Sequence, residues 1–205
     1  MKGYIFLIGV FCILCSCEDY YHDSGLANGK HDCTMWEYFE SQPGDWDSTM
    51  ILIEHAGLKS IFDGSGEYKQ ITFFGVTNLS IEQLLVKTID DDWEPIYNRV
   101  KDIPVDLCRE MLLSHIIPGK IMKTGFDYEV KGTLTGGTMV TTLSGVELRV
   151  YRTKSSYGGV PDIGAEGLRI HAPVSGNIAS IASADIEVTN GVVHSLDYTY
   201  QFTQL

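Results

Sequence analysis

The sequence predicts one α+β domain behind a short N-terminal export segment. The first half of the chain carries apolar residues at helical spacing, whereas the second half carries alternating apolar and polar residues that are typical of strands. Helices followed by strands indicate an α+β fold rather than alternating βαβ units. At 205 residues, with 44% hydrophobic and 20% charged residues, the chain is long enough for one domain with a buried core.

The first residues indicate export rather than a membrane span. Residues 3–14 are uninterrupted apolar sequence behind Lys2. A stretch this short suits a secretory signal, because a spanning helix needs about 20 residues. The stretch ends in Leu14-Cys15-Ser16-Cys17, which resembles a bacterial lipobox, where a small residue directly precedes the acylated cysteine. Cys17 is therefore the expected lipidation site; the alternatives are a plain cleaved signal and a short buried helix.

These features divide the chain into a lipoprotein signal peptide at residues 1–16, a lipidated tether at residues 17–31 and one domain at residues 32–205. The residues behind Cys17 are Glu18-Asp19-Tyr20-Tyr21-His22-Asp23, similar to the acidic export signals of some gram-negative lipoproteins. We therefore expect an outer-membrane lipoprotein of the cell envelope, exposed at the surface, with periplasmic display as the alternative. The membrane, held through the N-terminal lipid, is the first expected partner.

Apolar spacing and capping residues predict four helices in the first half of the domain. The first covers residues 33–41 and ends before Pro43. The second is expected to have Asp47 as its N-cap, to run through Ala56, and to end at Gly57.

The third and fourth helices are expected to carry start signals. Ser80 is expected to cap the third, with Gln83 completing a capping box and Leu79 packing on Leu84 as a hydrophobic staple. Pro104 opens the fourth. Its apolar stripe consists of Leu107, Cys108, Met111, Leu112 and His115.

Strands are expected at residues 70–76, 146–151, 168–171, 186–189 and 192–202. In the second of these, Val146, Leu148 and Val150 alternate with Glu147, Arg149 and Tyr151, as in a half-buried strand. The last strand is the clearest, because six residues share one face: Val192, His194, Leu196, Tyr198, Tyr200 and Phe202.

Several motifs then occur in the order of a known family. An Ala56-Gly57-Leu58 helix end precedes residues 71–78, residues 112–119 hold a central histidine, residues 141–145 lead into a strand, and residues 184–197 close the domain. Together they resemble a fasciclin domain over roughly residues 32–203. The resemblance implies a fasciclin-like compact β-sandwich flanked by several α-helices, which serves adhesion and extracellular recognition without catalysis.

Charge and motifs narrow the chemistry. A formal net charge of −12 disfavours nucleic acid as a partner, because phosphates are repelled. The sequence has no nucleophile elbow, phosphate loop or zinc-protease motif, and its histidines lack metal-ligand spacing. We therefore expect no enzyme activity, no cofactor and no metal. His115 and His194 lie on apolar faces and are interpreted as buried structural histidines. Asp90-Asp91-Asp92 is interpreted as a solvated turn rather than a calcium site.

Residues 152–167 are the expected ligand-facing segment. Arg152 and Lys154 are basic within an acidic protein, and Tyr151 and Tyr157 supply aromatic area of the kind that anchors interfaces. The alternative is a hairpin tip without a role.

Cys33 and Cys108 are the thiols left after export and acylation. They either form a disulfide, which export permits, or leave Cys108 as a small buried hydrophobe on its helix.

The expected function is therefore adhesion, or binding of an extracellular protein or glycan, by a lipid-anchored fasciclin-like protein. One alternative is an accessory subunit that holds a glycan or a partner in an outer-membrane uptake system. A less favoured alternative is a hydrolase of envelope polymers, which clustered carboxylates or histidines in a cleft would support.

Overall fold

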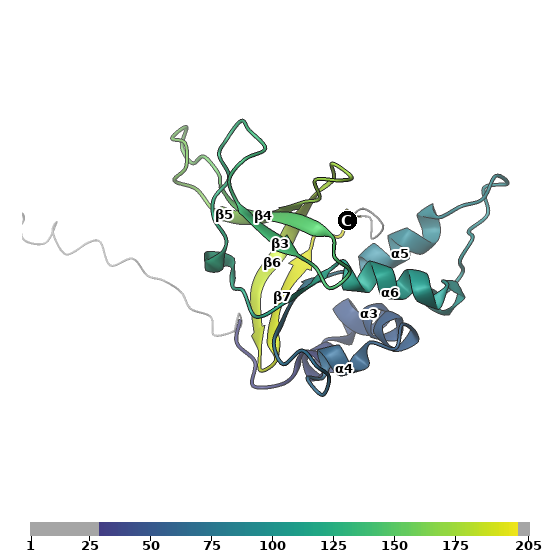
Figure 1. Cartoon of the computed structure of the whole chain (residues 1–205). Coiled ribbons are helices and arrows are strands. Elements are labelled where there is room, and N and C mark those ends of the chain that lie inside the picture. Colours follow the sequence, from purple (N-terminus) through teal and green to yellow (C-terminus); the bar gives the residue numbers. More distant parts are fainter. Residues whose placement is uncertain (1–28, 201–205) are drawn as a thin grey trace, which may run out of the picture.

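The computed structural model describes residues 29–200, and Figure 1 shows them as a group of helices beside a strongly curved sheet. The lipobox, Cys17 and most of the predicted tether lie outside the described residues. Within residues 29–200, none of the helices has the length and apolar character that a membrane crossing requires.

Helices dominate the first half of the described chain, as the periodicity predicted. Their bounds are α2 (Met35–Ser41), α3 (Pro43–His55), α4 (Lys59–Phe62), α5 (Asn78–Lys87) and α6 (Val105–Leu113), with short 3-10 turns η1 (Val100–Asp102) and η2 (Lys123–Gly125).

The strands form one seven-stranded sheet in the order β2-β1-β7-β6-β5-β4-β3. Their bounds are β1 (Ile71–Gly75), β2 (Ile116–Pro118), β3 (Thr138–Thr141), β4 (Glu147–Lys154), β5 (Glu166–His171), β6 (Ile178–Val188) and β7 (Gly191–Leu196). Only β1 and β7 pair in parallel, and every other neighbouring pair is antiparallel. The α+β prediction is confirmed.

The long strand β6 joins the two halves of the sheet. Its first residues pair with β5, and its later residues pair with β7 across two register shifts. Asp185 lies at the second irregularity, with a φ of 62°. Bulges of this kind bend and twist a strand, so one continuous sheet wraps around the core (Figure 1).

Aromatic side chains fill the core between the first helices and β1. Phe39 stacks on Trp46 with ring centroids 4.6 Å apart, and Phe62 meets Phe73 edge-on at 5.0 Å. All four side chains are almost completely buried. Offset and edge-on contacts add to the free energy of burying such rings, so this cluster fixes the helices against the sheet.

Two helix starts differ from the sequence prediction. Asp47 does not cap α3, because the helix begins at Pro43, with Gln42 as its N-cap, five residues earlier than predicted. Gly57 does follow the end of α3, with a φ of 67°.

Ser80 is not the cap of α5, which begins at Asn78 behind Thr77. The Ser80 side chain is buried instead, and Leu79 is 54% exposed rather than stapled. Gln83 Nε2 donates to Tyr198 O at 2.8 Å, so this residue connects α5 to the chain behind β7.

The strand predictions were partly wrong at their ends. β7 stops at Leu196, and its six residues are all buried, because β7 lies between β1 and β6 near the middle of the sheet. A turn follows, in which Asp197 Oδ1 accepts from Thr199 N and Oγ1. Arg149 and Tyr151 were expected on an exposed face but are 5% and 3% exposed.

Candidate basic binding pocket

The end of the β4–β5 hairpin carries a pocket built from two segments. The backbone of residues 127–129 runs beside the outer end of β4, where Arg152 N donates to Asp127 O and Glu129 N donates to Arg152 O. Below it, Arg149 Nη1 donates to Thr135 O and Gly136 O, which holds the returning chain against β4. Tyr128 is thereby placed against the side chains at the end of β4.

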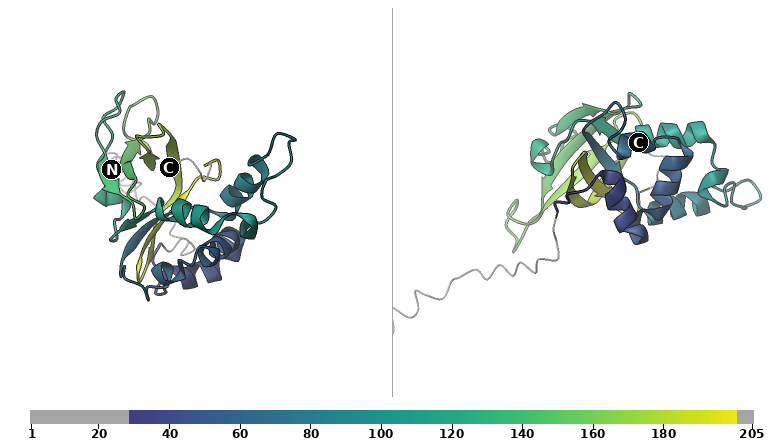
Figure 2. Two further views of the ribbon diagram at one scale, coloured as in Figure 1. Left: turned by 45° about the vertical axis from the view of Figure 1, so that its right-hand side comes forward. Right: turned by 90° about the horizontal axis from the view of Figure 1, so that it is seen from below.

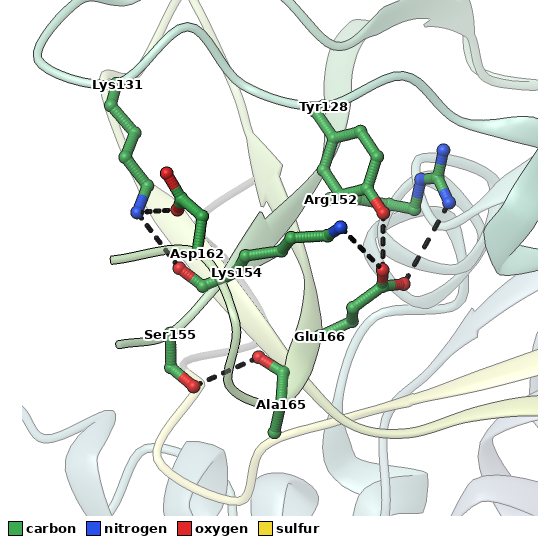
Figure 3. A network of polar contacts seen from close by, with 8 residues as sticks. All are labelled: Tyr128, Lys131, Arg152, Lys154, Ser155, Asp162, Ala165 and Glu166. Atoms are coloured by element: carbon green, nitrogen blue, oxygen red, sulfur yellow. Dashed lines mark hydrogen bonds and ion pairs between the residues drawn. The ribbon is translucent and has the colours of Figure 1, made fainter. Parts of the chain in front are cut away.

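Glu166 is the centre of the polar network in this pocket (Figure 3). The Tyr128 hydroxyl donates to its carboxylate, Lys154 Nζ lies 3.5 Å from Oε1, and Arg152 Nη1 lies 3.9 Å from Oε2. The hydrogen bond from Tyr128 and the charge of Lys154 lower the pKa of Glu166. The carboxylate of Glu166 therefore already occupies a site that basic and aromatic side chains form.

Tyr128 also presents its ring to both cations. The Arg152 guanidinium carbon lies 4.0 Å from the ring centroid and Lys154 Nζ lies 4.9 Å from it. Cation–π contacts of this kind hold long basic side chains in place, so the two cations are positioned before any ligand arrives.

Lys131 and Asp162 close the outer side of the pocket. Lys131 forms an ion pair with Asp162 and donates to Lys154 O at 3.1 Å. Ser155 Oγ donates to Ala165 O across the base of the hairpin tip, as Figure 3 shows. The two contacts of Lys131 tie the 128–136 segment to the β4–β5 hairpin.

We call the two adjoining hollows at this end the basic pocket. Their volumes are about 350 and 430 Å³, and both are lined by Glu129, Lys131 and Lys154. The charged lining residues of the two are Lys131, Arg152, Lys154 and Arg169 against Glu129, Asp162 and Glu166, a net charge of +1. The whole chain has a net charge of −12, so this pocket differs in sign from its surroundings.

Among the cations that line the basic pocket, Arg169 is the one without a charged partner in the described residues. It projects from β5 as an exposed residue and lines the second hollow. Within residues 29–200 its guanidinium has no hydrogen bond or ion pair. A guanidinium presents a planar set of donors that matches carboxylate, sulfate and phosphate groups.

Of the predicted binding residues, Arg152 and Lys154 line the basic pocket, whereas Tyr151 does not. Tyr151 is buried, and the Arg149 guanidinium carbon lies 4.2 Å from its ring centroid, so it is unavailable to a ligand. Tyr157 is 74% exposed at the hairpin tip, where its backbone pairs with Val160.

His115 lies in the core between α6 and the chain behind β7. Its Nδ1 donates to Met111 O at 2.6 Å, and its Nε2 accepts from the Tyr200 hydroxyl at 2.8 Å. Burial lowers the pKa of His115 to about 4. The ring is therefore neutral at physiological pH and connects two elements of the fold.

His194 plays a similar part on β7. Its Nε2 donates to Ile121 O at 2.9 Å, and its Nδ1 accepts from Asp185 N at the β6 irregularity. Burial lowers its pKa as well. Both imidazoles are surrounded by groups of the fold rather than by solvent.

Both cysteines of the domain are free thiols. Cys33 precedes α2 and is half-buried, whereas Cys108 is fully buried on α6, where burial raises its pKa to about 11. The structure thus holds Cys108 as a small buried residue. No three His, Cys, Asp or Glu side chains within residues 29–200 gather as a metal ion would require.

The comparison with protein families matches this architecture. The Fasciclin domain model matches residues 44–199, which include the β1 segment, the His115 segment and the β6–β7 turn. The chain belongs to the fasciclin family. Fasciclin domains are generally non-enzymatic and serve adhesion or binding.

Among solved structures, this fasciclin domain is similar to a FAS1 domain pair from the insect cell adhesion molecule fasciclin I. The sequence identity is 16% and the TM-score is 0.48. The match covers 73% of this chain and 44% of the other, so the chain spans less than half the length of that pair. A comparison with curated proteins gave no match.

Sequence reasoning missed most of the basic pocket of this fasciclin domain. It counted the positive charges of Arg152 and Lys154 but left out the negative charges of Asp162 and Glu166. With all four included, residues 152–167 have no net charge. The excess positive charge comes from Lys131 and Arg169. The only local signal for Arg169 was its position between Leu168 and Ile170, which marks an outward-facing residue in a strand.

Proposed function

We propose that this fasciclin domain is a lipid-anchored adhesion or ligand-binding protein of the outer-membrane surface, and that its basic pocket binds an acidic extracellular protein or glycan. The family supports binding in general. The lipobox and the acidic residues behind it support the anchor and the location. Two or three acyl chains on Cys17 would anchor the protein stably.

The observation that carries the proposal is the guanidinium of Arg169, which has no polar partner within residues 29–200. It lies beside Lys131 and Lys154, which are held by Asp162 and Glu166 at the protein surface. Exposed ion pairs contribute little to stability. A ligand carboxylate or sulfate therefore gains a free bidentate partner at Arg169 and displaces weak surface pairs at small cost.

Binding by the full chain in detergent would test the pocket. The probes are polygalacturonate, which carries carboxylates, and heparin, which carries sulfates, with neutral dextran as the reference. We expect the acidic polymers to bind and dextran not to bind, and we expect affinity to fall with salt. The double variant Lys131→Ala/Arg169→Ala should bind about tenfold more weakly, since two charge-assisted contacts are lost.

The matched control is Lys87→Ala/Lys101→Ala, which removes two exposed cations from α5 and η1. This variant should keep wild-type affinity. Equal losses in both double variants would mean that net charge alone governs binding, and the pocket would be rejected as the site.

Labelling of cells with a fatty-acid probe would test the anchor. Replacing Cys17 with Ala should abolish incorporation of the probe and leave an unprocessed precursor, because the acylated thiol is missing. Cys15→Ala is the matched control and should be labelled normally. Labelling of the Cys17→Ala variant at the wild-type level would contradict lipidation at this residue.

A further inference from the structure

A second exposed feature stands on the opposite side of the molecule from the basic pocket. The chain between α5 and η1 extends away from the helices as a narrow loop (Figures 1 and 2). Trp93 lies in this loop and is 81% exposed, whereas Trp36 and Trp46 are buried in the core. An indole that remains in water gains nothing from hydrophobic burial in this fold.

The backbone of the loop holds Trp93 in an unfavourable conformation. Asp90 N donates to Glu94 O at 2.9 Å, and Asp90 Oδ1 accepts from Asp92 N and Glu94 N. Trp93 N donates to Asp90 O, and its φ is 65°, a region that favours glycine. The most exposed aromatic residue of the described chain thus lies where glycine would suit the backbone better.

The surroundings of Trp93 are acidic and partly apolar. Asp91, Asp92 and Glu94 are exposed, and their carboxylates have no hydrogen bond or ion pair with any residue between 29 and 200. Ile96 is 51% exposed and Val86 is 64% exposed nearby in the sequence.

Two of the cations in the elements that flank this loop have acceptors of their own. Lys87 Nζ donates to Gln83, and the Arg99 guanidinium pairs with Asp102. The carboxylates beside Trp93 therefore keep their negative charge uncompensated. A ligand for this loop must bring the positive charge itself.

From these contacts we infer that the Trp93 loop, residues 89–96, is a docking site for a lysine- or arginine-rich segment of a partner protein. A basic side chain over the indole face forms a cation–π contact. Its neighbours along the segment pair with Asp91, Asp92 and Glu94. An anionic membrane surface fits poorly, because the same carboxylates repel it. This site is separate from the basic pocket. It selects a basic partner, whereas the basic pocket selects an acidic one.

Titration of the full chain in detergent with oligoarginine and oligolysine tests the inference. Trp93 is the exposed tryptophan among the three in the sequence, so intrinsic fluorescence should change on binding. Oligoglutamate should produce no change.

Calorimetry then compares variants with the same peptides. Trp93→Gly should weaken binding about threefold to tenfold, and it should remain folded because glycine suits the backbone there. Trp93→Phe should retain part of the affinity. Asp91→Asn/Asp92→Asn should also weaken binding, whereas the control Glu67→Gln/Glu110→Gln removes the same charge from exposed sites on the helical side and should have no effect.

Three results would overturn the inference. Trp93→Gly could bind as tightly as wild type, the two double variants could lose affinity equally, or zwitterionic vesicles could bind wild type but not Trp93→Gly. The last result would identify a membrane contact instead. The Lys131→Ala/Arg169→Ala variant should bind the basic peptides normally, so this test is independent of the basic pocket.

Discussion

The two halves of the curved sheet place their polar side chains in different surroundings. Around β7, His115, His194 and Asn190 are buried, and their polar atoms bind backbone groups or another buried side chain. Around β4 and β5, Lys154 and Arg169 reach solvent, and their partners are surface carboxylates or absent among the described residues. The two sets therefore differ in the source of their partners: buried groups of the fold serve the first set, whereas surface carboxylates and solvent serve the second.

This difference has an energetic basis. A buried polar atom that loses its partner costs the full penalty of desolvation, about 1–3 kcal/mol. An exposed ion pair contributes about 0–1 kcal/mol, because water replaces the lost partner. The β7 side should therefore respond to substitution through folding, and the basic pocket should respond through binding.

The largest effect on stability is expected at Asn190. Its Oδ1 accepts from Met35 N in the first turn of α2, and its Nδ2 donates to Phe62 O at the end of α4. These are end groups that the helices cannot satisfy themselves. Asn190→Ala leaves both groups buried without a partner, so the free energy of unfolding should fall by about 3 kcal/mol. Urea denaturation measures this fall as a lower midpoint.

Arg169→Ala provides the matched comparison from the basic pocket. Its side chain has no polar partner within residues 29–200, so stability should change by less than about 0.5 kcal/mol. If Arg169→Ala unfolded as easily as Asn190→Ala, the proposed division between folding and binding residues would be wrong.

Asn190 also illustrates how far the sequence predicts the fold. Asn190-Gly191 belongs to the closing motif. The order of the motifs predicted the family, and a helical half followed by a strand-rich half predicted the α+β class. The sequence did not show the role of Gly191, because that role depends on the neighbouring strand β1. A Cβ at position 191 would collide with Ile71 O. Long-range approaches of this kind leave no local pattern.

The prediction of which strand residues are exposed was wrong for the same reason. Alternation predicts which residues share a face of a strand, but not whether another element covers the second face. At Tyr151 that cover includes Gly137, which lies against its Cβ, and the Arg149 guanidinium, which lies over its ring. Arg149 in turn donates to Thr135 O and Gly136 O. The basic pocket was hidden likewise, because Tyr128 and Lys131 approach β4 from a separate segment without regular periodicity.

A smaller effect on stability is expected from pH, and it concerns the buried histidines around β7. Burial lowers the pKa of His115 to about 4, below its ordinary value of about 6.5. Between these values the unfolded chain binds a proton that the folded chain does not, so stability falls as the pH falls. From pH 7 to pH 5 the loss attributable to His115 should be about 2 kcal/mol. The lowered pKa of His194 acts in the same direction.

Urea denaturation at pH 7 and at pH 5 would measure this dependence. In His115→Gln the group that titrates is gone, so the fall in stability between the two pH values should be smaller than in wild type. Ser114→Ala is the control, because it removes a hydroxyl 3.1 Å from His115 Nδ1 and leaves the imidazole in place. It should keep the wild-type dependence on pH. An unchanged dependence in His115→Gln would mean that His115 binds its proton equally in both states, and that its burial does not control its charge.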